Sequence, residues 1–187
     1  VKNTQSMFFS AYKFNAHLSA WDLGEVTEMA SMFRDSNWNN GASAGVSTTL
    51  SWDVEKVENM NNMFLDNGAF NANISAWKPL SVKGLRKTFK NATAFNNGFP
   101  AGSAGTATIS NTLDWNMPNL GSDLTNDWRW YGLYETFSGA PAFNSYINNW
   151  NVSSVTNISY MLYNATSFNQ PLDNWNVGSV RYMESMF

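Results

Sequence analysis

Two pairs of carboxylates stand close enough in the sequence to serve as a general acid and a general base. Asp22 and Glu25 form one pair, and Asp53 and Glu55 form the other. Such chemistry also needs a nucleophile and a group that stabilises the developing charge, and neither pair is accompanied by such a set. We therefore expect no catalytic residues and a protein that is not an enzyme.

Metal chemistry has few ligands to draw on. The chain has no cysteine, one histidine (His17) and no loop with the calcium-binding pattern D-x-[DN]-x-[DN]-G. Asp123 and Asp127 could share a cation, but we favour a solvated loop at this position. We expect no metal site and no cofactor.

Aromatic residues surround a cation in the stretch NDWRWYG, which occurs once in the chain. It places Trp128, Trp130 and Tyr131 around Arg129. Aromatic and arginine side chains supply much of the binding energy of protein interfaces. The same side chains could instead pin this segment to the body of the protein. The stretch is a candidate interaction site, and both interpretations stay open.

A tryptophan and an asparagine recur at fixed intervals along the whole chain. Four of six units span 25 residues, and the units run over 4–28, 29–59, 60–84, 85–132, 133–157 and 158–182, with a partial unit at 183–187. The tryptophan column is Trp21, Trp52, Trp77, Trp115, Trp150 and Trp175, and the asparagine column is Asn15, Asn39, Asn71, Asn96, Asn144 and Asn169. Such a period predicts stacked repeats.

Each column has a binding interpretation and a structural one. The tryptophans could stack on sugars, but an apolar residue two positions later favours the core. The asparagines could bind glycans or cations, but a ladder that satisfies backbone groups is the stronger interpretation. The outward positions beside the tryptophans form another candidate interaction surface: Asp22, Asp53, Lys78, Asn116, Asn151 and Asn176.

Two patterns within each unit predict its secondary structure. In M-x-x-M-F-x-x-A the apolar residues have the i, i+3, i+4, i+7 spacing of a short helix. The W-D-V segment alternates apolar and polar residues like a strand. We therefore predict an α/β fold, a right-handed leucine-rich-repeat-like solenoid of about six coils over 1–187 with no internal domain boundary. Because the chain starts and stops within the repeat pattern, we expect a longer array.

The phrases MFRDSNWN, WDVEKVENMNNMF and SFNQPLDNWNVGSVRYMESMF resemble a bacterial surface-protein repeat of about 26 residues. That family is a domain of unknown function related to BspA-like leucine-rich repeats, and the resemblance covers essentially the whole chain. It implies display and adhesion at an extracellular, cell-surface or virion-surface location, with no known catalytic residues. Inserts in the second and fourth units, and Lys78-Pro79 where the motif has Asp-Val, depart from the pattern.

Composition bounds the classes of partner. The chain carries a net charge of −3 and no basic cluster longer than Arg86–Lys87, so we expect no nucleic-acid binding. No apolar run is long enough to insert into a membrane. We expect a non-catalytic surface protein whose partner is a protein or a glycan. The alternative is a subunit of an extracellular filament or virion fibre that associates with further copies of itself, and an enzyme is a distant third.

Overall fold

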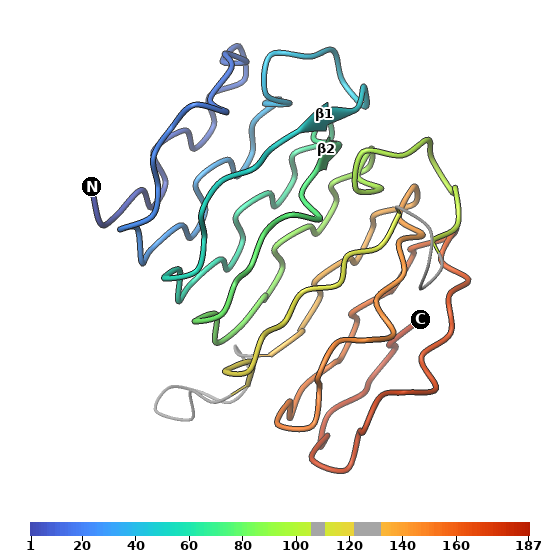
Figure 1. Cartoon of the computed structure of the whole chain (residues 1–187). Helices are drawn as coiled ribbons and strands as arrows, with labels where there is room; N and C mark the ends of the chain where they lie inside the picture. Colours follow the sequence, from blue (N-terminus) through green and yellow to red (C-terminus); the bar gives the residue numbers. More distant parts are fainter. Residues whose placement is uncertain (106–110, 122–131) are drawn as a thin grey trace.

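Successive repeats lie on top of one another as coils. The computed structural model describes residues 1–105, 111–121 and 132–187. The coils follow in chain order from the N-terminus to the C-terminus (Figure 1). Parallel single-residue bridges join equivalent positions of neighbouring coils: Asn3 with Glu28, Glu28 with Asn59, Asn59 with Gly84, and Asn157 with Tyr182.

In the described residues, the only extended strands are two short ones. Strand β1 (Thr48–Thr49) pairs in parallel with β2 (Ala72–Asn73), with Thr48 opposite Ala72. The described residues contain no helix. The predicted leucine-rich-repeat-like α/β solenoid, with one helix and one strand in each coil, is therefore wrong.

A run of tight turns replaces the predicted helix because the neighbouring coil takes half of the backbone donors. The Thr88 N–H donates to the Leu85 carbonyl three residues back (3.1 Å), whereas the next N–H, of Phe89, donates to the Thr136 carbonyl of the following coil (2.9 Å). An α-helix would bond each of these amides to the carbonyl four residues back. Stacking of coils and formation of helices thus compete for the same donors.

The turns depend on residues in the left-handed backbone region at four-residue spacing. The pairs are Ser31 and Asp35, Asn62 and Asp66, Lys87 and Asn91, and Tyr160 and Asn164, all with φ between 53° and 58°. Ser, Asn and Asp favour turns, and Asn and Asp tolerate this conformation. A four-residue turn period keeps the apolar spacing of the motif on one face, so Leu85, Phe89 and Ala92 are fully buried without a helix.

Replacing Gly139 with alanine should destabilise the protein. Gly139 has a φ of 67°, and an added Cβ would lie 2.1 Å from the Asn91 Oδ1. We expect the free energy of unfolding, measured in urea, to fall by about 1–3 kcal/mol because strain and a close contact add. Asn91→Gly in the same background removes the contacting amide and should recover part of the loss. An unchanged stability for Gly139→Ala would contradict the turn geometry.

Stacked aromatic rings fill the core between coils. Neighbouring rings in a column lie nearly parallel, with centroids 5.2–6.0 Å apart. One column is Phe8, Phe33, Phe64, Phe89 and Phe137; a second is Trp38, Phe70, Phe95, Phe143 and Phe168; a third is Trp52, Trp77, Trp115 and Trp150. The buried members belong to one hydrophobic cluster that runs through the coils.

Candidate functional site

Most tryptophans of the column are buried and bind the preceding coil. Trp77 is 2 % exposed, and its indole N–H donates to the Leu50 carbonyl of the preceding coil (2.7 Å). The same bond to the preceding coil is made by Trp52, Trp115, Trp150 and Trp175, with distances of 2.5–3.2 Å. Trp21, in the first coil, is 37 % exposed. The buried tryptophans cannot present a ring face to a sugar.

The asparagine column forms a ladder between side chains and backbone. The Asn71 Oδ1 accepts the Asn96 N–H of the next coil (2.8 Å), and its Nδ2 donates to the carbonyls of Gly45 and Phe99 (3.0 and 3.1 Å). The same side-chain-to-backbone step, at 2.7–2.9 Å, joins Asn15 to Asn39, Asn39 to Asn71, Asn96 to Asn144, and Asn144 to Asn169. These amide groups hold coils together, which leaves little of them for a ligand.

The outward polar positions beside the tryptophans are all exposed: Asp22, Asp53, Lys78, Asn116, Asn151 and Asn176. Four of them also shape a turn. The Oδ1 atoms of Asp22, Asp53, Asn151 and Asn176 each accept the backbone N–H two residues later, at 3.0–3.1 Å. One oxygen of each side chain therefore fixes the backbone, while the side chain itself remains at the surface.

Carboxylates of the two pairs seen in the sequence take part in backbone turn bonds and in one ion pair at the surface. Glu25 forms an exposed ion pair with Lys56, and the hydrogen bond and charge of Lys56 lower the pKa of Glu25. A lowered pKa keeps Glu25 ionised at neutral pH, whereas a general acid must carry a proton there. Asp53 is committed to its turn bond with the Glu55 N–H (3.0 Å).

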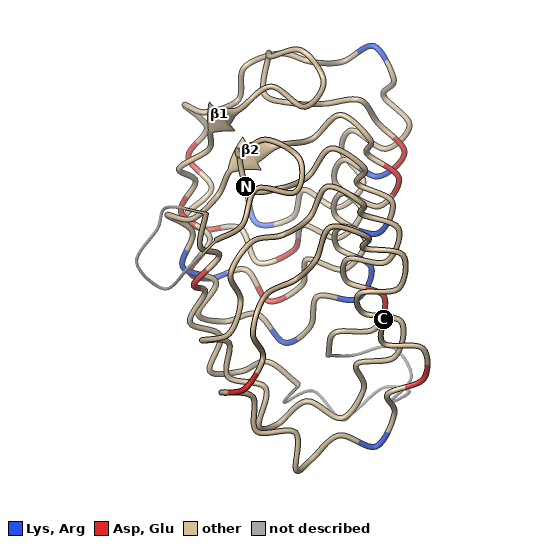
Figure 2. Ribbon diagram, turned by 90° about the vertical axis from the view of Figure 1, so that its right-hand side faces the viewer, with Lys and Arg blue, Asp and Glu red and all other residues tan. Residues whose placement is uncertain are grey.

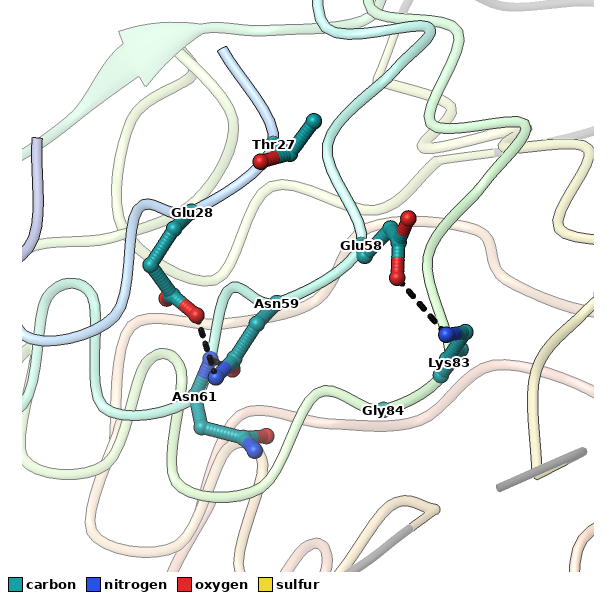
Figure 3. A pocket seen from close by; sticks show the side chains of 7 residues that line it. All are labelled: Thr27, Glu28, Glu58, Asn59, Asn61, Lys83 and Gly84. Carbon is teal, nitrogen blue, oxygen red and sulfur yellow. Dashed lines mark hydrogen bonds and ion pairs between the residues drawn. The ribbon is translucent and has the colours of Figure 1, made fainter. Parts of the chain in front are cut away.

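A polar hollow of about 250 Å³ lies at the edge of the first three coils (Figure 3). Glu58 and Lys83 form an ion pair across it (2.6 Å), and the Glu28 carboxylate accepts the Asn59 side-chain N–H (3.1 Å). The remaining lining residues are Thr27, Asn61 and Gly84. The hollow can admit hydroxyl groups or water, but the lining supplies no nucleophile paired with a base.

A second polar cluster is not visible in the repeat pattern because its members come from two different units. This Glu135 cluster consists of Arg86, Lys87, Lys90, Tyr134 and Glu135 on the outer side of the tight turns. Glu135 is 8 % exposed; Lys90 forms an ion pair with its Oε2, and the Lys87 Nζ lies 3.7 Å from the same oxygen. Aligning the polar positions of units four and five would have placed Arg86 and Lys87 beside Tyr134 and Glu135.

Aromatic rings extend the Glu135 cluster into the next coil. The Lys87 Nζ lies 5.7 Å from the centroid of the Tyr134 ring. Tyr134 meets Tyr160 edge to face at 6.1 Å, and Tyr160 meets Tyr163 in the same way at 5.9 Å. Several Lys and Arg positions follow one another down one edge of the stack with acidic positions between them (Figure 2). The outer side of the turns thus combines cations with partly exposed tyrosines.

Burial and mutual charge perturb the titration of this cluster. Burial alone would raise the pKa of Glu135. Hydrogen bonds from Lys90 and Tyr134, together with the charge of Lys87, outweigh this effect, so the pKa lies below its ordinary value. Burial, and then the bond to Glu135, raise the pKa of Tyr134 to about 12. Burial and the neighbouring cations Arg86 and Lys90 lower the pKa of Lys87. The lysines are thus crowded around one carboxylate.

Glu135→Gln should reduce the dependence of stability on acid pH. Because the folded pKa of Glu135 is lowered, its ionised form stabilises the fold above the ordinary value of 4.5, and this contribution is lost as pH falls through the folded pKa. The gap in unfolding free energy between the wild type and the variant should therefore be largest near neutral pH and shrink below pH 4.5. Glu55→Gln, at an exposed position, is the control. A gap that stays constant with pH would contradict the assigned pairing.

Six of the candidate residues named from the sequence are not among those that the structure describes. Trp128, Arg129, Trp130 and Tyr131 lie outside the described residues, as do Asp123 and Asp127. Within the described ranges, no group of three or more His, Asp or Glu side chains could hold a metal ion. The same ranges hold no helix that is long and apolar enough to span a bilayer.

Comparison with known proteins connects the chain to one family. The family described as "Mycoplasma protein of unknown function, DUF285" matches residues 1–48, 46–126 and 129–187. No curated protein and no solved structure matches the chain. The predicted resemblance to a repeat family of unknown function is confirmed, whereas the match does not extend to BspA-like proteins. With three successive matches over most of its length, the chain is a repeat protein that belongs to the DUF285 family.

Proposed function

We propose that the chain is a non-catalytic binding array that engages an extended partner, a glycan or a protein, through its side faces. The observation that carries this proposal is the regular spacing of the coils. Stacked rings of neighbouring coils lie 5.2–6.0 Å apart, so side chains at equivalent positions repeat at a similar step. A pyranose unit in an extended glycan advances by a comparable length. Successive coils can therefore meet successive sugars.

The outward polar positions beside the tryptophans support a contact of this kind. We call them the polar column: Asp22, Asp53, Lys78, Asn116, Asn151 and Asn176. Its members vary between carboxylate, amide and ammonium, and each stands on a coil fixed by the ladder and by the aromatic core. A rigid array of short polar groups loses little conformational entropy on binding. Many weak and equivalent contacts along one polymer also add up to useful avidity.

A location outside the cell is part of the proposal. It draws its support from the resemblance of the repeat phrases to bacterial surface-protein repeats, which are associated with display and adhesion. The polar surface of Asn, Ser, Thr and Gly, with only 13 % charged residues, suits contact with hydroxyl-rich partners.

A length series of immobilised and soluble glycans tests the proposed function. We expect the protein to be retained by at least one polysaccharide, with a Kd that falls as the oligosaccharide lengthens and with no shortening of the glycan over time. Retention by no glycan and no protein surface would overturn the proposal. Release of shorter products would instead indicate an enzyme. Fibres seen by light scattering and electron microscopy without any retention would favour the self-associating alternative.

A further inference from the structure

The Glu135 cluster, unlike the polar column, carries more positive than negative charge. Lys87 and Lys90 share the single carboxylate of Glu135, and 22 % and 27 % of their side-chain surfaces are exposed. Within the described residues, no other carboxylate forms an ion pair with either lysine. One positive charge is therefore left uncompensated at a partly buried position, where water screens it less than at a fully exposed one.

From this geometry we propose that the Glu135 cluster, with Tyr160 and Tyr163 of the next coil, binds an acidic polysaccharide whose carboxylate or sulfate groups lie against Lys87 and Lys90. This assignment rests on the proposed binding function and names its face and its ligand class. It concerns a different face from the polar column of Asp22 and Asp53.

Charge density favours a polysaccharide over a nucleic acid. Duplex DNA carries a phosphate charge about every 1.7 Å along its axis and needs many cations to bind. Lys87 and Lys90, which share Glu135, offer one excess charge, and the whole chain has a net charge of −3. A polyuronate or a sulfated glycan, with about one charge on each sugar or disaccharide, matches this sparse pattern.

The tyrosines supply the second half of sugar recognition. Tyr163 is 43 % exposed, and Tyr134 and Tyr160 are partly exposed beside it. A tyrosine offers an apolar ring for the C–H face of a sugar and a hydroxyl for hydrogen bonds. The exposed amide of Asn164, next to Tyr163, can donate to a sugar hydroxyl or carboxylate. Cations and aromatic rings are thus offered side by side on neighbouring coils.

The crowding of Lys87 and Lys90 around Glu135 favours the binding of an anion at this position. Burial and the charges of Arg86 and Lys90 lower the pKa of Lys87, which means that its ammonium form is less stable in the folded protein. A bound carboxylate or sulfate would offset that cost. Binding should accordingly weaken as salt rises.

Matched substitutions of lysine and one substitution of glutamate test the assignment. The probes are alginate oligosaccharides for carboxylates, kappa-carrageenan oligosaccharides, with one sulfate on each disaccharide and no carboxylate, for sulfates, and neutral dextran of equal length. Lys87→Asn suits the φ of 56° at this position and should raise the Kd for an acidic probe about tenfold. Lys13→Asn makes the same change at an exposed lysine of the first coil, which belongs to neither the Glu135 cluster nor the polar column, and should leave the Kd unchanged.

Glu135→Gln separates a binding role from a structural one. It releases both lysines from their shared carboxylate, so we expect severalfold tighter binding to the acidic probe, even though the fold becomes less stable. Weaker binding by Glu135→Gln, or equal losses for Lys87→Asn and Lys13→Asn, would overturn the assignment. Alginate and kappa-carrageenan differ in the anion they present, so the tighter of the two, compared at an equal number of charges, identifies whether carboxylate or sulfate is preferred.

Two outcomes distinguish this inference from the broader proposal. Equal binding of dextran and the acidic probes would leave the proposed function intact and overturn the acidic site. Binding of duplex DNA as tight as that of the polysaccharide would show a general polyanion surface and would also overturn it. Binding of no glycan would overturn the acidic site, and it would overturn the proposed function as well only if no protein surface retained the chain either.

Discussion

Replacing Trp77 with alanine should lower the free energy of unfolding by about 3–5 kcal/mol. Trp77 is 2 % exposed and stacks between Trp52 and Trp115, with centroids 6.0 and 5.9 Å away. The substitution leaves a cavity between two coils and removes the donor to the Leu50 carbonyl (2.7 Å). Urea unfolding followed by circular dichroism measures the loss.

Two further substitutions separate the parts of this effect. Trp77→Phe keeps a ring in the column but removes the indole donor, so its cost should be intermediate. Trp21→Ala should cost less than Trp77→Ala because Trp21 is 37 % exposed. A loss below about 1 kcal/mol for a folded Trp77→Ala variant would contradict the core position of this column.

Changing Asn96 to aspartate should cost about 3–5 kcal/mol at neutral pH. The side chain is fully buried, its Nδ2 donates to the carbonyls of Pro100 and Ser103 (2.7 and 3.1 Å), and its Oδ1 accepts the Asn144 N–H (2.8 Å). Aspartate has the same shape but would set a carboxylate oxygen against two carbonyl oxygens. Thermal and urea unfolding at pH 7 should both show the loss.

Asn176→Asp is the matched control for the ladder. Asn176 is exposed and uses only its Oδ1, which accepts the Gly178 N–H (3.0 Å), and aspartate retains this acceptor. The equivalent positions of the first two units already hold Asp22 and Asp53. We expect a change within about 0.5 kcal/mol. Equal effects at positions 96 and 176 would show that the buried amide does not hold the coils together.

The repeat and its inward-facing positions could be predicted from the sequence because they depend on side-chain spacing alone. Leu85, Phe89 and Ala92 are buried at the spacing that the motif sets. Spacing does not reveal which carbonyl each amide bonds, and a helix and a run of turns can bury the same positions. The prediction of helices failed at this step.

A local signal for turns was nevertheless present in the sequence. Ser31, Asp35, Asn62 and Asp66 recur at four-residue spacing on the polar side of the motif, and all have positive φ. Such residues compete with helices by favouring turns. The Glu135 cluster could not be found from the shared motif, because Lys87, Tyr134 and Glu135 are specific to their units. Only the register between units brings them together.

The central claim is that backbone bonds between coils replace a helix within each coil, and one measurement tests it directly. Scalar couplings across hydrogen bonds, measured by NMR in ¹⁵N,¹³C-labelled protein, identify the carbonyl that accepts each amide. We expect the Phe89 amide to couple to the Thr136 carbonyl, 2.9 Å away in the next coil. A coupling from Phe89 to the Leu85 carbonyl, four residues back, would show a helix and contradict the account.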